Sequence, residues 1–492
     1  MRLAALALLS ACFPPDADGD GALIPADCDD GNAEVFPGAG ETCGNGVDDD
    51  CDETATGCGP AGRMSVDDAN ARIVGDGQYG EGWAIRAMLG PGDIDGDGVS
   101  DVVVGAPGDY RERGAVFVIA GPIVGTLEIA GREPTYQGEH RIGVGREFAA
   151  GDVTGDGTAD LVISAGYDHD NRGHIVVLEG PVSMPTADVV MDVSFDGYYA
   201  SGIAAAGDVT GDGVGDILVG SPSIFDPEGK GSVWILPGGT IGKNNLVDVG
   251  FALTGEAAGD GAGRSVATGD INADGVPDVI MGGATTDRGG VAYIVLGPVT
   301  EGRALVDADI RIEGAYGESE VGSGLAAGDA DGDGYDDVLA SGFEEDDYHA
   351  DRMGYAAVAW LFSGPMERGG WTGRATATFR GTPGFEEPSN VPSGVAFAGD
   401  VDGDGKEDLL FGFHAACWRL GCTVLVRGVP DGIIDLAEAD TVIVGEEEAG
   451  GGSAAAGAGD LDGDGFSDIL VGGWYANRNG GVVSVIGGGP GF

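Results

Sequence analysis

Basic side chains are scarce in this sequence of 492 residues. It has 24 Lys and Arg against 83 Asp and Glu, which gives a formal net charge of −59 at pH 7. Nucleic-acid binding relies on clustered Lys and Arg that neutralise phosphates, and no basic stripe is present. The composition therefore excludes nucleic acid as a partner and favours cations as ligands.

The common motifs of enzymes are also missing. The chain has no G-x-S-x-G, H-E-x-x-H or P-loop sequence. Histidine occurs five times, without clustering, at His140, His169, His174, His349 and His414. We therefore expect no enzymatic activity. A glycosidase needs only two carboxylates, so a polysaccharide hydrolase or lyase stays open as the alternative function.

Long uncharged apolar runs are absent, and the one near the N-terminus is short. Arg2 followed by the apolar stretch Leu3 to Leu9 is typical of an export signal, whereas a bilayer span takes about 20 residues. "LSAC", which ends at Cys12, resembles a bacterial lipobox with Cys12 as the lipidated residue; an ordinary secretory signal cut nearby is the alternative. We expect a lipoprotein signal peptide in residues 1–12. The protein would then be an exported outer-membrane or cell-surface lipoprotein of a bacterium, held to the membrane only by its N-terminal lipid.

Cysteines are few, but six remain when Cys12 is set aside. An even number in an exported protein favours disulfides. Cys417 and Cys422, in "CWRLGC", flank a predicted hairpin turn and are expected to form one bridge. The sequence leaves open the pairing of the other four, Cys28, Cys43, Cys51 and Cys58.

Glycine, in contrast, is plentiful. The chain has 97 Gly and is 42% hydrophobic, so it has enough apolar material for a core and differs from disordered acidic chains. So much glycine without a collagen period indicates many tight turns, as in all-β repeat proteins.

One acidic motif recurs seven times. Its C-terminal copy is "GDLDGDGFSD", and the copies lie 56 to 71 residues apart. Each copy is followed by an aliphatic run such as "DILVGG", and each unit has four short apolar segments separated by Gly-rich turns. A helical period is missing. We predict an all-β fold over residues 68–492, a seven-bladed β-propeller of four-stranded antiparallel blades.

The ring is expected to close by pairing the two ends of this region. The last unit lacks its fourth segment, and "NARIVGDGQYGEG" at residues 70–82 resembles the fourth segment of another unit, "DTVIVGEEEAGGG". We expect Ile73 and Val74 to complete the seventh blade, which removes an exposed sheet edge.

The nine residues that start at the first Asp of each motif form what we call the acidic loop, numbered 1 to 9. Oxygen-bearing side chains stand at positions 1, 3, 5 and 9, and position 6 is always Gly. Ca²⁺ takes six to eight oxygen ligands, and Gly allows the sharp turn that wraps them around the ion. Position 12 is not Glu, which excludes an EF-hand. Acidic turns without metal are the alternative.

The resulting prediction is about seven Ca²⁺ sites, each with four side chains and the backbone carbonyl of position 7. Thr154, Thr210 and Asn272 replace Asp at position 3, so their loops are expected to bind more weakly. The predicted ligands are Asp93, Asp95, Asp97, Val99, Asp101; Asp152, Thr154, Asp156, Thr158, Asp160; Asp208, Thr210, Asp212, Val214, Asp216; Asp270, Asn272, Asp274, Val276, Asp278; Asp329, Asp331, Asp333, Tyr335, Asp337; Asp400, Asp402, Asp404, Lys406, Asp408; and Asp460, Asp462, Asp464, Phe466, Asp468.

The loop followed by "VVVGAPGD" resembles the FG-GAP repeat of integrin α-subunit N-terminal propellers, and "VGSPS" at residues 219–223 is a near match. The resemblance covers all seven units. It implies a seven-bladed propeller with calcium in the hairpin between the first and second strands of a blade. Integrins carry such loops in only some blades, whereas this chain has them in all seven.

Residues 13–62 form a second element, acidic and Cys-rich. This segment resembles an acidic, Cys-containing metal-binding motif of bacterial surface proteins, and its start resembles thrombospondin type 3 repeats. A flexible acidic stalk is the alternative. Candidate ligands for further Ca²⁺ are Asp16, Asp18, Asp20, Asp27, Asp29 and Asp30, followed by Asp48, Asp49, Asp50 and Asp52.

A partner is expected on the face opposite the acidic loops. The turns there carry scattered cations and non-repeated aromatic and His residues, which often make contacts in loops. The candidates are Tyr167, His169, Tyr348, His349, Trp418, Trp474 and Tyr475. The predicted function is a calcium-binding, lipid-anchored surface propeller that mediates adhesion or binds an unidentified surface protein or glycan.

Overall fold

The computed structural model describes most of the chain from Arg63 onward. Cys12, the segment 13–62, Cys417 and the contact candidates other than Trp474 lie outside the described residues, so the structure does not test the predictions for them. The described ranges are 63–66, 69–75, 85–107, 114–138, 143–166, 172–182, 188–196, 200–222, 229–283, 289–314, 319–345, 355–366, 375–381, 394–413, 420–429, 432–436, 439, 441–445, 454–474 and 480–489.

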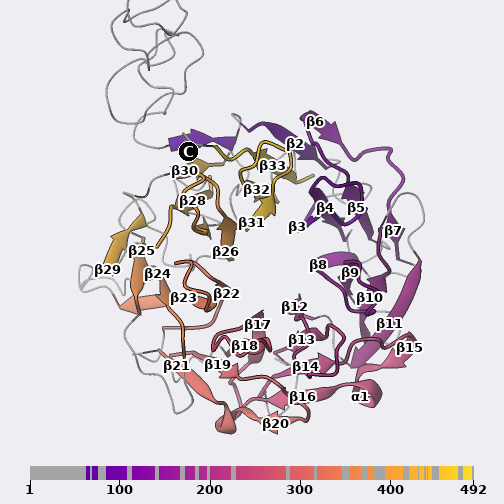
Figure 1. The fold of residues 1–492 in the computed structure, drawn as a ribbon, viewed down its shortest axis with the longest axis vertical. Coiled ribbons are helices and arrows are strands. Elements are labelled where there is room, and N and C mark those ends of the chain that lie inside the picture. The colour runs from indigo at the N-terminus through magenta and orange to yellow at the C-terminus, as the bar shows by residue number, and fades with distance from the viewer. Residues whose placement is uncertain are drawn as a thin grey trace, which may run out of the picture. The chain divides into compact units, whose positions relative to one another are not determined.

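Seven sheets, each of which forms one blade, are arranged around a ring. The strand that precedes the acidic loop of each blade is nearest the centre and is called its first strand (Figure 1). Successive strands of a blade pair in antiparallel fashion, as β8–β9 and β9–β10 do. The predicted seven-bladed, all-β propeller is therefore confirmed. In the part of the chain that the structure describes, α1 (Leu246–Val249) and the 3-10 helix η2 (Leu305–Asp307) lie in connections.

The blades follow the order of the chain. Blade 1 is β3 (Ala87–Gly92), β4 (Asp101–Ala106), β5 (Ala115–Ile119) and β7 (Tyr136–Gln137); blade 2 is β8 (Val144–Gly151), β9 (Asp160–Ala165), β10 (Arg172–Leu178) and β11 (Val189–Asp196); blade 3 is β12 (Gly202–Ala205), β13 (Ile217–Ser221), β14 (Ser232–Leu236) and β16 (Phe251–Thr254); blade 4 is β17 (Ala262–Gly269), β18 (Asp278–Gly283), β19 (Val291–Val295) and β21 (Ile310–Glu313); blade 5 is β22 (Leu325–Gly328), β23 (Asp337–Glu345), β24 (Tyr355–Phe362) and β25 (Ala377–Arg380); blade 6 is β26 (Gly394–Gly399), β27 (Asp408–Phe413), β28 (Cys422–Val426) and β30 (Thr441–Val444); and blade 7 is β31 (Ala454–Gly459), β32 (Asp468–Gly473), β33 (Val482–Ile486) and β2 (Ala71–Val74).

The core consists of apolar clusters between neighbouring blades. The second strands are buried on both faces, and their side chains alternate between two clusters: Val102 and Val104 pack with blade 7, whereas Val103 packs with blade 2. This two-residue period follows from the pleat of a strand. The aliphatic run after each acidic loop is thus the material that joins one blade to the next.

Small residues in the first strands allow the blades to meet near the centre. A Cβ atom on Gly90 in β3 would lie 2.4 Å from the Cα of Ala458 in β31, a distance that excludes any side chain. This close approach explains why the residues before each acidic loop are mostly Gly and Ala.

Strand β2, from the start of the described chain, completes blade 7. Ala71 pairs with Val485 and Ile73 with Val483 in antiparallel register, and the Ile73 side chain is fully buried. The ring closes as the sequence predicted. Removal of this strand would expose the edge of β33.

Five blades have an additional fifth strand that the sequence did not predict. The segment before the fourth strand of one blade pairs with the fourth strand of the preceding blade: β6 (Gly125–Glu128) runs parallel to β2, and β15 (Gly242–Asn245) runs parallel to β11. These segments cover outer sheet edges that would otherwise be open to pairing with other chains. The others are β1 (Arg63–Ser65) beside β30, β20 (Arg303–Ala304) beside β16 and β29 (Gly432–Asp435) beside β25.

Candidate functional site

The acidic loops lie where the sequence predicted, between the first and second strands of all seven blades. The backbone of each loop folds around the carboxylate of the Asp at position 1. In blade 7, Asp460 Oδ1 accepts hydrogen bonds from the backbone N–H groups of Gly463 (2.6 Å) and Asp464 (3.0 Å), and Oδ2 accepts one from Gly465 (3.0 Å). Gly463 and Gly465 have φ values of 82° and 96°, which favour glycine.

Position 9 is buried and has a structural role that the sequence did not reveal. Asp468 is 1% exposed. Its Oδ2 accepts a hydrogen bond from the N–H of Leu461 at 2.7 Å, and its Oδ1 accepts one from Gly488 at 2.9 Å, just beyond β33. Position 9 thus connects the loop to the end of the third strand.

The connection to a downstream glycine recurs around the ring. A Gly that follows the third strand donates to position 9 of its own blade in all seven cases. Four of these glycines precede a proline. A Gly 19 to 22 residues after position 9 in six units, and 27 residues after it in blade 5, was the sequence signal for this contact. The donors are Gly121, Gly180, Gly238, Gly297, Gly364, Gly428 and Gly488.

Burial raises the pKa of most position 9 carboxyls, although the backbone donors act in the opposite direction. The pKa of Asp278 and that of Asp337 are raised to about 7, mainly by desolvation. The pKa values of Asp101, Asp216, Asp408 and Asp468 are also raised, with burial as the largest cause. A nearby positive charge would favour the ionised form.

Carboxylate oxygens converge in the four loops that have Asp at position 3. In each of these loops, three acids offer oxygen atoms that lie within 4.8 Å of one another. Ligands that share one Ca²⁺ at about 2.3–2.6 Å are at most about 5 Å apart, so this spacing suits the ion. The groups are Asp93, Asp95 and Asp101; Asp329, Asp331 and Asp333; Asp400, Asp402 and Asp404; and Asp460, Asp462 and Asp464.

Three buried oxygens in the loops lack hydrogen-bond partners among the described residues. They are Oδ2 of Asp337, a fully buried side chain, Oγ1 of Thr154 at position 3 of its loop, and Oε2 of Glu407 at position 8 of loop 6. In loop 5 the backbone N–H of Ala330 donates to Gly328 instead. An unpartnered buried carboxylate oxygen is costly unless a cation or donor meets it. The loops therefore fit a hard cation, although the complete ligand set remains a prediction.

Neighbouring acidic loops also contact one another. Asp336 at position 8 of loop 5 accepts a hydrogen bond of 2.7 Å from the backbone N–H of Asp270 in loop 4. A Cβ on Gly328, just before loop 5, would lie 2.6 Å from Glu407 Oε2 of loop 6. Burial and then the charges of Asp336 and Asp329 raise the pKa of Glu407. Acidic side chains of loops 5 and 6 therefore lie close to the neighbouring loop in the ring.

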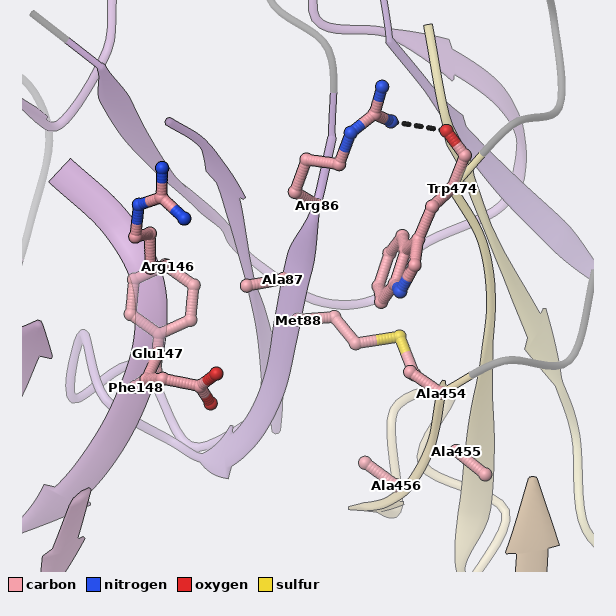
Figure 2. A pocket seen from close by; sticks show the side chains of 10 residues that line it. All are labelled: Arg86, Ala87, Met88, Arg146, Glu147, Phe148, Ala454, Ala455, Ala456 and Trp474. Carbon is pink, nitrogen blue, oxygen red and sulfur yellow. Dashed lines mark hydrogen bonds between the residues drawn. The ribbon is translucent and has the colours of Figure 1, made fainter. Parts of the chain in front are cut away.

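A separate pocket of about 420 Å³ lies among the first strands of blades 1, 2 and 7 (Figure 2). It contains Trp474, the one contact candidate within the described part of the chain. The sequence analysis did not identify the other residues that line the pocket. The lining residues are Arg86, Ala87, Met88, Arg146, Glu147, Phe148, Ala454, Ala455, Ala456 and Trp474.

Two further features concern the predicted Cys417–Cys422 bridge and membrane-spanning helices. Cys422 is fully buried at the start of β28, while its expected partner Cys417 lies outside the described residues, so the bridge stays a prediction. In the described residues, no helix is long and apolar enough to cross a membrane.

Comparison with known proteins supports the FG-GAP resemblance. The family model described as "FG-GAP repeat" matches residues 89–119, 144–178 and 200–236, which lie in blades 1 to 3. The model described as "Putative metal-binding motif" matches residues 27–55, within the acidic Cys-rich segment. The chain therefore contains FG-GAP repeats and, before them, a motif of this second kind.

Two curated relatives match part of the chain. Integrin alpha-PS2 of Drosophila melanogaster is 32% identical over 222 residues, which are 40% of this chain and 15% of that protein. Phosphatidylinositol-glycan-specific phospholipase D of Rattus norvegicus is 31% identical over 176 residues, 32% of this chain and 20% of that protein. The chain thus spans a small part of these relatives' length.

The solved structure of BBS1N in complex with ARL6DN contains a chain similar to this one. The match covers 84% of this chain and 93% of that chain, with 11% sequence identity and a TM-score of 0.44. The FG-GAP matches and the seven blades show a propeller that contains FG-GAP repeats and is similar over part of its length to an integrin α subunit.

Proposed function

We propose that this FG-GAP repeat propeller is a calcium-binding, lipid-anchored cell-surface protein that mediates adhesion by binding an extracellular protein or glycan. The observation that carries the proposal is the convergence of three carboxylates within 4.8 Å in each of four acidic loops. The matching motif in all seven blades supports a ring of such sites.

Electrostatics favours calcium in these loops. Two like charges about 4 Å apart repel by about 4 kcal/mol at an effective dielectric constant of about 20. Bound Ca²⁺ would supply the positive charge that offsets this repulsion. Position 1 shapes the loop, positions 3 and 5 present oxygens, and position 9 holds the loop against the end of the third strand.

The proposed adhesion surface lies at the ends of the first strands that are away from the acidic loops. Strand β3 begins beside Arg86 in the pocket and ends at the acidic loop that starts with Asp93. The pocket and the loops therefore lie at opposite ends of the same blades. This arrangement leaves the pocket end for a partner. The lipid anchor and the surface location rest on Cys12 and the residues before it.

Calcium titration of the metal-stripped protein tests the first part. We expect about seven bound ions and a higher melting temperature, whereas a chain that binds none would overturn the proposal. For the second part, the purified protein is passed over immobilised glycans and surface extracts, with and without EGTA. Calcium-dependent retention without turnover supports adhesion.

A polysaccharide hydrolase or lyase is the second candidate. The match to a rat phospholipase D is consistent with an enzyme that contains such a propeller, but it covers 20% of that protein. Release of reducing ends or unsaturated sugars in the same glycan screen would favour this candidate over adhesion.

A further inference from the structure

The pocket near the centre of the ring combines two arginines with an aromatic wall. Arg86 precedes β3 in blade 1, and Arg146 lies in β8 of blade 2. Figure 2 shows both guanidinium groups extending to the same end of the pocket, and the Glu147 carboxylate nearer the other end. The other lining residues in the described part of the chain are uncharged. In a chain with 24 basic and 83 acidic residues, two arginines that extend to one pocket end favour an anion there.

Trp474 is held in place from two sides. Arg86 donates a hydrogen bond from Nη1 to the Trp474 carbonyl. A Cβ on Gly472 would lie 2.6 Å from Cη2 of the indole, so the ring lies directly over this glycine. Trp474 and Met88 also pack against the core cluster between blades 7 and 1. The aromatic wall is therefore preorganised, which lowers the entropy lost when a ligand binds.

The opposite wall is fixed in a similar way. The Phe148 ring lies over Gly105 in blade 1, where an added Cβ would be 2.8 Å from Cζ. Glu147, between Arg146 and Phe148 in β8, is open to solvent. The pocket thus offers two planar cations, two aromatic rings and one hydrogen-bonding carboxyl group.

We propose that this pocket binds the carboxylate-bearing sugar unit of an acidic polysaccharide, with Arg86 and Arg146 at its carboxylate and Trp474 against its ring. This inference rests on the proposed glycan-binding function and names the class of glycan. Arginine matches a carboxylate with two parallel hydrogen bonds. The C–H face of a sugar packs on an indole, and its hydroxyl groups donate to Glu147.

Size and charge favour a sugar over an acidic peptide. A pocket of about 420 Å³ is at the lower end of the range of about 300–1,000 Å³ for small-ligand sites and suits one or two sugar rings. Successive carboxylates of an acidic peptide would meet Glu147, whereas sugar hydroxyl groups would bond to it. Screening over about 8 Å at physiological salt limits repulsion from the acidic loops.

Blade 4 supplies a matched control. Arg264 is the third residue of β17, as Arg146 is of β8. It pairs with Glu320 at 3.2 Å and does not line the pocket. Arg264→Gln therefore removes the same charge from the corresponding strand position without changing the proposed site.

The test is titration calorimetry of the full chain at constant calcium concentration. The probes are oligosaccharides that contain glucuronate, galacturonate or mannuronate, their neutral counterparts, and hexaglutamate. We expect at least one uronate probe to bind, with no binding of the neutral counterparts or the peptide. Arg146→Gln should weaken binding at least tenfold, Trp474→Ala should do so as well, and Arg264→Gln should leave affinity unchanged.

Three results would contradict the proposed sugar-binding site. The proposal is overturned if no uronate probe binds, if hexaglutamate binds instead, or if Arg264→Gln weakens binding as much as Arg146→Gln does. Thermal melting of each variant verifies that it folds. A melting experiment with and without calcium tests the loops separately, so that failure of the pocket and failure of the calcium-dependent propeller are distinguished.

Discussion

The buried carboxylate of Asp468 accepts a hydrogen bond of 2.9 Å from the backbone N–H of Gly488, which lies 20 residues further along the chain. Its second oxygen accepts one of 2.7 Å from Leu461 within the acidic loop. One side chain therefore connects the loop, the start of β32 and the end of β33 through contacts that involve no cation.

Replacement of this residue by asparagine should destabilise the protein even without calcium. In Asp468→Asn, the amide N–H₂ faces one of two backbone donors, and a hydrogen bond to a charged group contributes about 1.5–3 kcal/mol. We expect the free energy of unfolding in EGTA to fall by about that amount, measured by denaturant titration. Asp464→Asn is the control, because this exposed residue keeps an oxygen for the N–H of Phe466. Equal stability of Asp468→Asn and the parent in EGTA would contradict the structural role.

The closing strand makes a second prediction. Ile73→Ala removes a fully buried side chain from β2 at the junction of the two chain ends. Such truncations in a core cost about 2–5 kcal/mol. The control is Ile433→Ala in β29, where the side chain is 68% exposed, and a loss below about 1 kcal/mol is expected. Similar losses for the two variants would show that β2 is not part of the cooperative fold.

Glu147 gives the stability a pH dependence. The protein packed around the pocket desolvates the Glu147 carboxyl, although water reaches the side chain from the pocket. This desolvation raises the pKa of Glu147 from 4.5 to about 7, and neighbouring Arg146 acts in the opposite direction. Among the described lining residues, the other charged group is Arg86, and arginines do not titrate in this range. The folded state thus holds a proton that the unfolded state releases, so stability falls as pH rises from about 4.5 to about 7.

Glu147→Gln should remove this part of the pH dependence. We expect the variant to melt above the parent at pH 8 and to show no such gain at pH 4.5, by calorimetry in one buffer series. A gain of the same size at both pH values would mean that the carboxyl charge is not the cause.

Position 3 should control calcium affinity. Thr154 offers one uncharged oxygen, which is buried and has no hydrogen-bond partner in the described part of the chain. Thr154→Asp adds a carboxylate at that place, and ligand charge is one determinant of calcium affinity. We expect affinity at this loop to increase roughly tenfold, measured by competition with a chelator. The reverse change, Asp95→Thr in loop 1, should decrease it; an increase there would contradict the ligand role of position 3.

The sequence predicted the features that repeat. Oxygen-bearing residues at fixed spacing located the loops between first and second strands, and the spare apolar segment around Ile73 predicted closure. Both signals come from local spacing, which is preserved in the fold because each unit forms one blade.

Other features depend on how blades meet, which a single unit does not encode. The fifth strands escaped prediction because a segment such as Gly125–Glu128 is mostly exposed and lacks an apolar pattern. Arg86 and Arg146 belong to different blades, and irregular pairing near Leu89 in β3 and Val144 in β8 shifts their spacing from the acidic loops. The position 9 connection was hidden because a buried Asp has the same sequence signature as a metal ligand.

The most direct test of the account is differential scanning calorimetry of the full chain in metal-stripped and calcium-replete buffer. Each ion that binds only the folded state stabilises it by RT ln(1 + [L]/Kd), so several occupied loops should raise the melting temperature in a calcium-dependent manner. Identical melting in both buffers, with no calcium bound to the loops, would contradict a calcium-binding propeller.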